Sequence, residues 1–133
     1  MIYVLDSDTV SYMLKSDETV LARYRKESDD NDIIIPAIVY YEVQRGLLAL
    51  KMNKRLLEFD KLCRAIKYEE FDKAVWQKAA YVYAQLRQSG SLIDDADIFI
   101  AAFCIVNGCT LVTNNIKHFS RIEGLSYVNW TCG

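Results

Sequence analysis

Proline, glycine and histidine are scarce in this chain of 133 residues, which contains one proline, five glycines and one histidine. Collagen-like and linker-rich proteins need many prolines or glycines, so both classes are excluded. The longest apolar run extends only from Ile98 to Val106, whereas a membrane-spanning helix needs about 20 residues. The apolar fraction of 52% and the charged fraction of 26% are those of a globular protein, which excludes disorder as the main state.

Residues 1–6 do not have the pattern of a signal peptide, and the chain has no excess of basic charge. Residues 1–6 contain no basic leader and no cleavage site of small residues, so we expect no signal peptide and a cytoplasmic location. Lys and Arg number 16 against 18 Asp and Glu, which gives a formal net charge of −2. Any contact with nucleic acid therefore requires a local basic patch or a metal ion.

The cysteines do not have the spacing of a zinc site. Cys63, Cys104, Cys109 and Cys132 form no Cys-x-x-Cys pair, and His118 is the only histidine. A zinc site of the usual Cys/His type is therefore not expected. In a reducing cytoplasm we expect free thiols, with Cys104 and Cys63 as the candidates for packing in the core as small hydrophobes.

Short apolar strands alternate with helical patterns along the chain. Strands are predicted at 2–5, 33–35, 110–113 and 126–128, and helices at about 19–26, 36–50, 54–64, 72–88 and 96–107. Pro36 is expected as the first residue of its helix, and Asp94 or Asp95 as the cap of the helix at 96–107. That helix is apolar on all sides and is expected to be the most buried one. The alternation predicts a parallel sheet with helices on both faces.

Acidic and amide side chains come from four segments that all reach one edge of this predicted sheet. Side chains that follow a parallel strand lie at its carboxyl edge, and a helix that precedes such a strand begins there. Ligands of open α/β sheets bind beyond this edge. The residues are Asp6, Asp8, Glu42, Asp94, Asp95, Asp97, Asn114 and Asn115.

Such a cluster favours a bound cation. Two carboxylates ~4 Å apart repel each other by about 4 kcal/mol at an effective dielectric near 20. Oxygen ligands suit Mg²⁺ or Mn²⁺, which lower the pKa of bound water and stabilise a phosphoryl transition state. Each acid alone also has a structural explanation as a turn former, a helix cap or a partner of the helix dipole. The convergence of the segments, rather than any one acid, indicates a metal site.

In order and spacing, these segments resemble a PIN-domain ribonuclease, and most closely a VapC-type toxin of a type II toxin–antitoxin system. The matching pieces are 4–8, 38–46 around Glu42, 93–102 around Asp97, 111–115 with Phe119, and 124–130. The resemblance covers nearly the whole chain. It implies a single PIN domain over 1–133, with a three-layer α/β/α sandwich and a mostly parallel sheet of about four to five strands.

The resemblance also implies a site and an activity. Asp6, Glu42 and Asp97 match the three acids that hold Mg²⁺ or Mn²⁺ in an endoribonuclease. Asn115 matches a fourth catalytic position that is Asp in many relatives, and its lack of charge argues against tight binding of a second metal ion. The candidate supporting residues are Ser7, Asp95 and Thr113.

The implied reaction is hydrolysis of phosphodiester bonds in structured RNA, such as tRNA or rRNA loops. Glu42 would hold or deprotonate the attacking water. The implied partners are a second copy of the chain and a small antitoxin protein. Residues 47–50 with Leu56 and Leu57 either offer this antitoxin an apolar groove or form a core between two helices. Candidate contacts to phosphates are Lys15, Lys51, Lys54, Arg55, Lys117 and Arg121, and candidates for base stacking are Tyr12 and Tyr40.

Two other functions fit parts of the same pattern. Residues 6–10 also resemble the first motif of haloacid-dehalogenase-like phosphatases, in which Asp6 is the nucleophile and Asp8 the general acid. In that family the acidic pair follows the Thr and Lys motifs, whereas here the acids at 94–97 precede Thr113 and Lys117. The other alternative is an inactive PIN-like RNA-binding module, which only the uncharged residue at position 115 supports.

Overall fold

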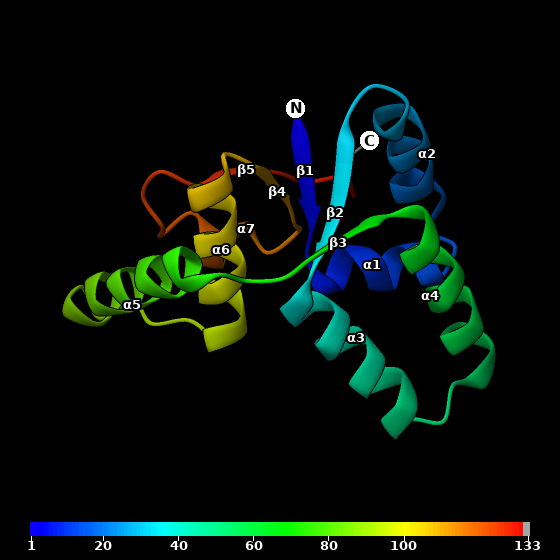
Figure 1. The fold of residues 1–133 in the computed structure, drawn as a ribbon, viewed down its shortest axis with the longest axis horizontal. Helices are drawn as coiled ribbons and strands as arrows, with labels where there is room; N and C mark the ends of the chain where they lie inside the picture. Colours follow the sequence, from blue (N-terminus) through cyan, green and yellow to red (C-terminus); the bar gives the residue numbers. More distant parts are fainter. Residues whose placement is uncertain (132–133) are drawn as a thin grey trace.

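A parallel sheet of five strands runs through the centre of the computed structural model, which describes residues 1–131 (Figure 1). The strands are β1 (Ile2–Leu5), β2 (Asp32–Pro36), β3 (Lys67–Glu69), β4 (Thr110–Val112) and β5 (Ser126–Val128). They lie in the order β3-β2-β1-β4-β5, and every neighbouring pair is parallel. The predicted α/β fold is confirmed.

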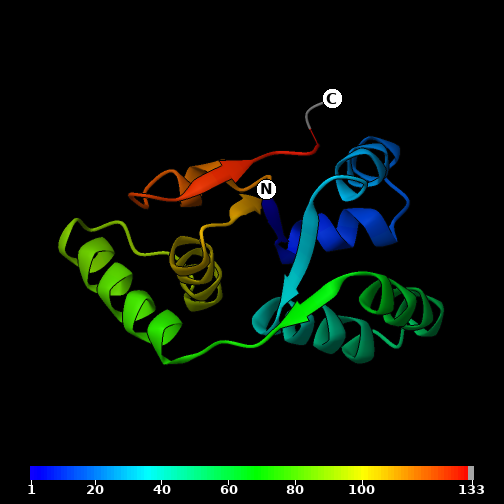
Figure 2. The ribbon, with the colours of Figure 1, turned by 45° about the horizontal axis from the view of Figure 1, so that its top comes forward.

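Helices cover both faces of the sheet, as predicted. They are α1 (Ser7–Leu14), α2 (Glu18–Ser28), α3 (Ala37–Ala49), α4 (Asn53–Ala65), α5 (Lys73–Gln88), α6 (Asp95–Asn107) and α7 (Ile116–Phe119). Figure 2 shows α5 and α6 on one side of the strands and α1 and α2 on the other. Within residues 1–131, none of the helices has both the length and the apolar character that crossing a membrane requires.

Aspartate side chains begin three of the helices. The carboxylates of Asp6, Asp17 and Asp72 accept hydrogen bonds from backbone N–H groups one turn into α1, α2 and α5, at 2.8, 3.1 and 3.2 Å. Each bond satisfies a donor that the first turn of a helix leaves free. Asp94 stands at the cap position of α6 but makes no such side-chain bond.

Three short elements are not predicted by the sequence pattern. They are α1, β3 and α7, which have eight, three and four residues. A helix of one or two turns has too few residues for a clear 3.6-residue period, and its stability comes from packing rather than from propensity. The strand β3 lies at the edge of the sheet, where its residues are mostly exposed and show no apolar run.

Pro36 differs from its predicted position by one place. It is the last residue of β2 and the cap of α3, with φ −77° and ψ 158°. The ring of proline fixes φ at a value that suits extended backbone as well as helical backbone. Pro36 therefore ends the strand, and the helix begins at Ala37.

The core centres on α6, which packs against the sheet and α5. Its buried residues are Ile98, Ile100, Ala101, Ala102, Phe103 and Cys104, more than any other helix buries among residues 1–131. This confirms the predicted burial of α6 and of the Cys104 thiol. The helix α5 also buries an apolar stripe, from Val75 to Leu86 at helical spacing. Cys132 lies outside the described residues.

Leucines at the junction of α3 and α4 are not core residues. The side chains of Leu48, Leu50 and Leu57 are 56%, 74% and 67% exposed. For these three, the expectation of a core between two helices is wrong. The helices α3 and α4 pack together, but Leu48 and Leu57 line an open hollow between them, and Leu50 lines a second hollow beside α1.

Two helices end in a left-handed residue that is not glycine. Ser16 follows α1 with φ 61°, and Lys51 follows α3 with φ 54°. In each case the next residue's N–H donates back to a helix carbonyl, from Asp17 to Tyr12 at 2.9 Å and from Met52 to Leu47 at 3.0 Å. This closing turn normally favours glycine, because a Cβ makes left-handed backbone costly.

Candidate active site at the carboxyl edge of the sheet

The pairing of β1 with β4 brings Asp6 and Thr113 side by side. Leu5 is in register with Val112, the last residue of β4. The Asp6 N–H donates to the Val112 carbonyl at 3.1 Å, and the Thr9 hydroxyl donates to the same oxygen at 3.0 Å. These bonds fix the point at which β1 and β4 both end.

The carboxylate of Asp6 is buried at this point, with only 5% of the residue exposed. It accepts a hydrogen bond from the Thr9 N–H at 2.8 Å. Burial raises its pKa from the usual 3.8 to about 6, although hydrogen bonds from Thr113 and Thr9 act in the opposite direction. The Thr113 hydroxyl accepts from the Asn115 N–H at 2.9 Å, which leaves its own proton for Asp6.

Ser7 connects the start of α1 to Glu42 on α3. The Ser7 hydroxyl donates to a carboxylate oxygen of Glu42 at 2.6 Å. Both side chains are half-buried. Ser7 follows Asp6 directly, so this bond holds Glu42 beside the carboxyl end of β1.

Asp97, in the first turn of α6, faces both Glu42 and α7. Burial raises the pKa of its half-buried carboxyl group, and the negative charges of Glu42 and Asp94 add to this effect. A hydrogen bond from His118 and the charge of that ring act to lower the pKa. Asp97 thus lies in the field of a second acid of the predicted set.

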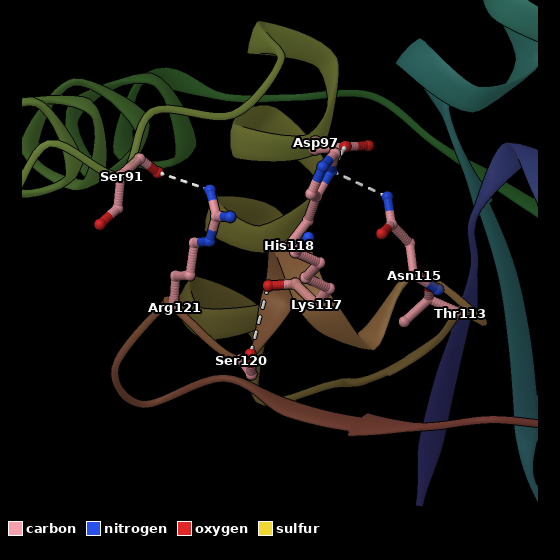
Figure 3. A network of polar contacts seen from close by, with 8 residues as sticks. All are labelled: Ser91, Asp97, Thr113, Asn115, Lys117, His118, Ser120 and Arg121. Carbon is pink, nitrogen blue, oxygen red and sulfur yellow. Dashed lines mark hydrogen bonds and ion pairs between the residues drawn. The ribbon is translucent and has the colours of Figure 1, made fainter.

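His118 is a member of this site that the sequence pattern does not identify. Its ring nitrogen Nδ1 lies 3.3 Å from a carboxylate oxygen of Asp97 and 2.8 Å from the side-chain nitrogen of Asn115. Figure 3 shows the His118 ring between these two side chains. A protonated Nδ1 donates to Asp97, and an unprotonated one accepts from the amide. The available signal is its place three residues after Asn115, on the short helix that Asn115 precedes.

Other predicted residues lie outside this group. Asp8 and Asp95 are exposed, and within residues 1–131 no hydrogen bond joins their side chains to the other acids. The Asn114 amide donates to the Tyr12 hydroxyl at 2.9 Å, which restrains that ring. Arg121 donates to the Ser91 carbonyl at 3.3 Å, directed away from Asp97 (Figure 3).

The donor atoms of the group fit a hard divalent cation. Asp6, Glu42, Asp97 and Asn115 offer carboxylate and amide oxygens, the ligand type that Mg²⁺ and Mn²⁺ prefer. In the described part of the chain, however, no three His, Cys, Asp or Glu side chains already converge as a ligand set. Each of the three acids is instead engaged in a hydrogen bond: Asp6 with Thr9, Glu42 with Ser7, and Asp97 with His118. The assignment of these acids as metal ligands therefore stays a prediction.

Comparisons with known proteins match nearly the whole chain. The family model described as the PIN domain matches residues 3–125. Ribonuclease VapC2 of Rickettsia felis is 32% identical over 136 residues, which cover 98% of this chain and 98% of that protein. Ribonuclease VapC1 of Methanocaldococcus jannaschii is 33% identical over 110 residues, covering 80% and 79%.

Solved structures agree with these matches. The structure of VapBC2 from Rickettsia felis, bound to a DNA fragment from the promoter, contains a chain with a TM-score of 0.92 and 29% identity. The match covers 98% of this chain and 99% of that one. A chain of VapBC-1 from nontypeable Haemophilus influenzae has the same fold, with a TM-score of 0.88, 22% identity and coverage of 98% and 99%.

Proposed function

This chain belongs to the PIN-domain family, and we propose that it is a VapC-type endoribonuclease that depends on Mg²⁺ or Mn²⁺. The observation that carries the proposal is the buried Asp6 at the carboxyl end of β1, with Thr113 beside it. A carboxylate with 5% exposure is costly unless a cation or hydrogen bonds compensate it. The names of the relatives, ribonuclease VapC, support the same activity.

Asp6, Asp97 and Glu42 are the residues that would hold the metal. When bound, Mg²⁺ or Mn²⁺ lowers the pKa of a water molecule and neutralises charge on the phosphate. Glu42 would accept the proton of the attacking water, and the 2.6 Å hydrogen bond from Ser7 would orient its carboxylate. His118 contacts Asp97, Asn115 contacts His118, and Asn115 adds no negative charge. The site therefore has three carboxylates, which favours one tightly held metal ion over two.

The first test replaces Asp6 by Asn and measures cleavage of RNA by the purified protein. We expect the loss of cleavage with the fold retained, because Asn keeps an oxygen for the Thr9 N–H but loses the charge. Asp95→Asn is the matched control, since Asp95 is exposed and lies outside the group. Cleavage by D6N at the wild-type rate would overturn the assignment, and so would full activity of the wild type in excess EDTA.

The partners we propose are a small antitoxin and a second copy of the chain. The antitoxin is supported by structural neighbours that are VapBC assemblies, and the second copy by the family resemblance. Expression with and without the adjacent reading frame, followed by mapping of new RNA 5′ ends, tests this directly. We expect growth arrest and a dominant cleavage site only without the antitoxin. The same result in both cultures would contradict the pairing.

The family match and the position of Asp8 argue against the phosphatase alternative, whereas the inactive-module alternative is left to experiment. The match of residues 3–125 to the PIN domain argues against a haloacid-dehalogenase-like phosphatase, as does the exposed position of Asp8, its required general acid. An assay with p-nitrophenyl phosphate should show almost no turnover. An inactive RNA-binding module predicts RNA binding without cleavage, with or without divalent metal, so the D6N and EDTA experiments also decide that alternative.

A further inference from the structure

Two adjoining hollows form a groove that begins at the candidate site and ends among basic residues. The first, about 370 Å³, lies between α1, α3 and the start of α4, and Ser7 and Glu42 form part of its wall. The second, about 410 Å³, opens between the end of α1 and the start of α4. They share Leu14, Lys15, Met52 and Arg55, so they form one continuous surface. We call this surface the α1–α4 groove.

The far end of the α1–α4 groove carries three basic side chains. Lys15, Lys54 and Arg55 line it, with Glu58 as the one acid at that end among the lining residues. Within residues 1–131 no acidic group lies within 4.0 Å of any of these three cations. Cations without an acidic partner remain available for anions, and the guanidinium of Arg matches the geometry of a phosphate.

The middle of the groove is apolar. Its lining there includes Val43, Leu47, Leu50 and Met52. An apolar wall next to basic groups suits a nucleic-acid strand, because sugars can contact the apolar wall while the cations contact phosphates. The lining residues within 1–131 include no aromatic side chain, so the wall offers van der Waals contact rather than base stacking. It suits a free inorganic anion less well, because such an anion has no apolar part to bury.

The net charge of the protein makes such a local patch necessary. At −2, the chain as a whole does not attract RNA, and the acids of the candidate site repel it. Phosphate contacts supply most of the affinity for nucleic acid. Lys15, Lys54 and Arg55 attract phosphate groups at the far end of the α1–α4 groove. A strand that enters there is led along the groove toward the acids.

Backbone strain is found at the same place. Ser16 lines the second hollow, and Lys51 lies between Leu50 and Met52, which line the first. Both adopt the left-handed backbone that favours glycine. Strained residues of this kind occur preferentially at functional sites, where the strain is compensated elsewhere.

We propose that the α1–α4 groove binds the sugar-phosphate backbone of a single-stranded RNA segment and leads the strand to the carboxylates. The proposal rests on the proposed nuclease function. Lys15 and Arg55 contact phosphates on one side of the scissile bond, and Lys54 extends this contact outward. These residues bind substrate and take no part in proton transfer.

The test measures binding separately from cleavage. The full chain carries Asp6→Asn, EDTA is present, and the probe is a fluorescein-labelled unstructured RNA of 12 nucleotides. Lys15→Gln with Arg55→Gln is expected to weaken binding about 10-fold. It should also reduce the slope of log K against log salt by about 1.4, because each lost phosphate contact on a single strand contributes about 0.7. Lys54→Gln alone should give about half of that change in slope.

The matched control is Arg25→Gln with Lys26→Gln on α2, which removes the same charge from an exposed surface outside the groove. Its affinity and salt slope should stay close to those of the parent. In the active chain, the groove variant should raise KM for RNA and leave kcat within about twofold. Circular dichroism and the thermal midpoint verify that each variant is folded.

Three results would overturn the proposal: equal weakening in groove and control variants, an unchanged affinity for RNA, or weakened binding of the antitoxin alone. The last would make the groove a protein-binding site. If the parent binds RNA through the groove but the wild type cleaves no RNA with metal present, the proposed function fails while the groove assignment stands. The two proposals are therefore separable.

Discussion

The side chain of Asp6 has two opposing effects on the stability of the fold. It caps α1, which stabilises the fold, and it is a carboxylate with 5% exposure, which destabilises the ionised form. Because burial raises its pKa in the folded chain from 3.8 to about 6, the folded state favours the protonated acid. The stabilisation from this proton is complete below pH 3.8 and is lost as the pH rises through about 6.

Asp6→Asn should therefore stabilise the protein more at pH 7.5 than at pH 4. A shift of about two pKa units corresponds to about 3 kcal/mol. The difference in free energy of unfolding between D6N and wild type should therefore increase, in favour of D6N, by up to that amount from pH 4 to pH 7.5. Urea unfolding in chelator-treated buffer measures it. Parallel pH profiles for D6N and wild type would contradict the burial argument, and Asp95→Asn should show no such gain.

His118 is expected to position Asp97. Its ring contacts both Asp97 and Asn115, so its removal frees two side chains of the site. Loss of a group that orients a metal ligand typically costs 10- to 100-fold in metal affinity. His118→Ala should weaken Mn²⁺ binding by about that factor in titration calorimetry, and His118→Gln should recover part of the loss.

The neighbouring Lys117 supplies the control for this variant. Lys117 lies on the same short helix as His118 and is exposed, so Lys117→Ala should leave Mn²⁺ affinity unchanged. An equal effect of both substitutions would mean that α7 as a whole, rather than the imidazole, determines the result.

Residue positions could be predicted from the sequence where a simple rule applies. Asp6 and Asn115 follow strands, so their place at the carboxyl edge follows from a parallel sheet. The roles of Ser7 and His118 depend on how the helices pack against each other. Ser7 contacts Glu42, 35 positions away, and His118 contacts Asp97, 21 positions away. No local pattern contains that information, and the ligand assignments themselves stay predictions.

Among the elements, the helix ends at Ser16 and Lys51 have an unusual cost. A left-handed conformation of a residue with a Cβ costs roughly 1–2 kcal/mol relative to ordinary backbone. Glycine adopts it readily, as Gly90 and Gly108 do after α5 and α6 with φ 68° and 65°.

Lys51→Gly is accordingly expected to stabilise the fold by about 1 kcal/mol. The thermal midpoint should rise, which differential scanning calorimetry measures. Lys54→Gly is the opposite control, because residue 54 lies inside α4 and glycine there should cost up to about 1 kcal/mol. A lower midpoint for Lys51→Gly would show that its side chain makes a stabilising contact.

The long helices could be predicted, and the short helices α1 and α7 could not. The helices α5 and α6 have stripes or runs of apolar residues that extend over several turns, so their period is clear. The helix α1 begins one residue after the Asp6 cap, and its eight residues include β-branched Thr9 and Val10, which are not typical of helices. Packing against α3 and the cap bond of Asp6 decide its structure instead.

At the scale of the whole molecule, metal binding and stability are linked. A ligand that binds only the folded chain stabilises it by about 2.7 kcal/mol at 100 times its Kd. Mg²⁺ or Mn²⁺ should therefore raise the thermal midpoint of the wild type as the concentration increases. The same titration should have little effect on D6N, and an equal rise in both proteins would indicate metal binding elsewhere.

The overall architecture follows from the alternation of strands and helices, which predicts a parallel sheet covered on both faces. The exposed leucines at the junction of α3 and α4 do not follow from it, because the same apolar spacing describes a buried face and a groove. Leu50 is 74% exposed at the point where α3 ends and the chain turns through Lys51. Burial at that junction is a property of the tertiary arrangement.

The central position of β1 has a consequence for the protein during its synthesis. Asp6 is translated about a hundred residues before Thr113, Asn115 and His118, and β1 has no partner on that flank until β4 exists. The proposed catalytic site is therefore incomplete until the segment that forms β4 and α7 has been synthesised and has paired with β1.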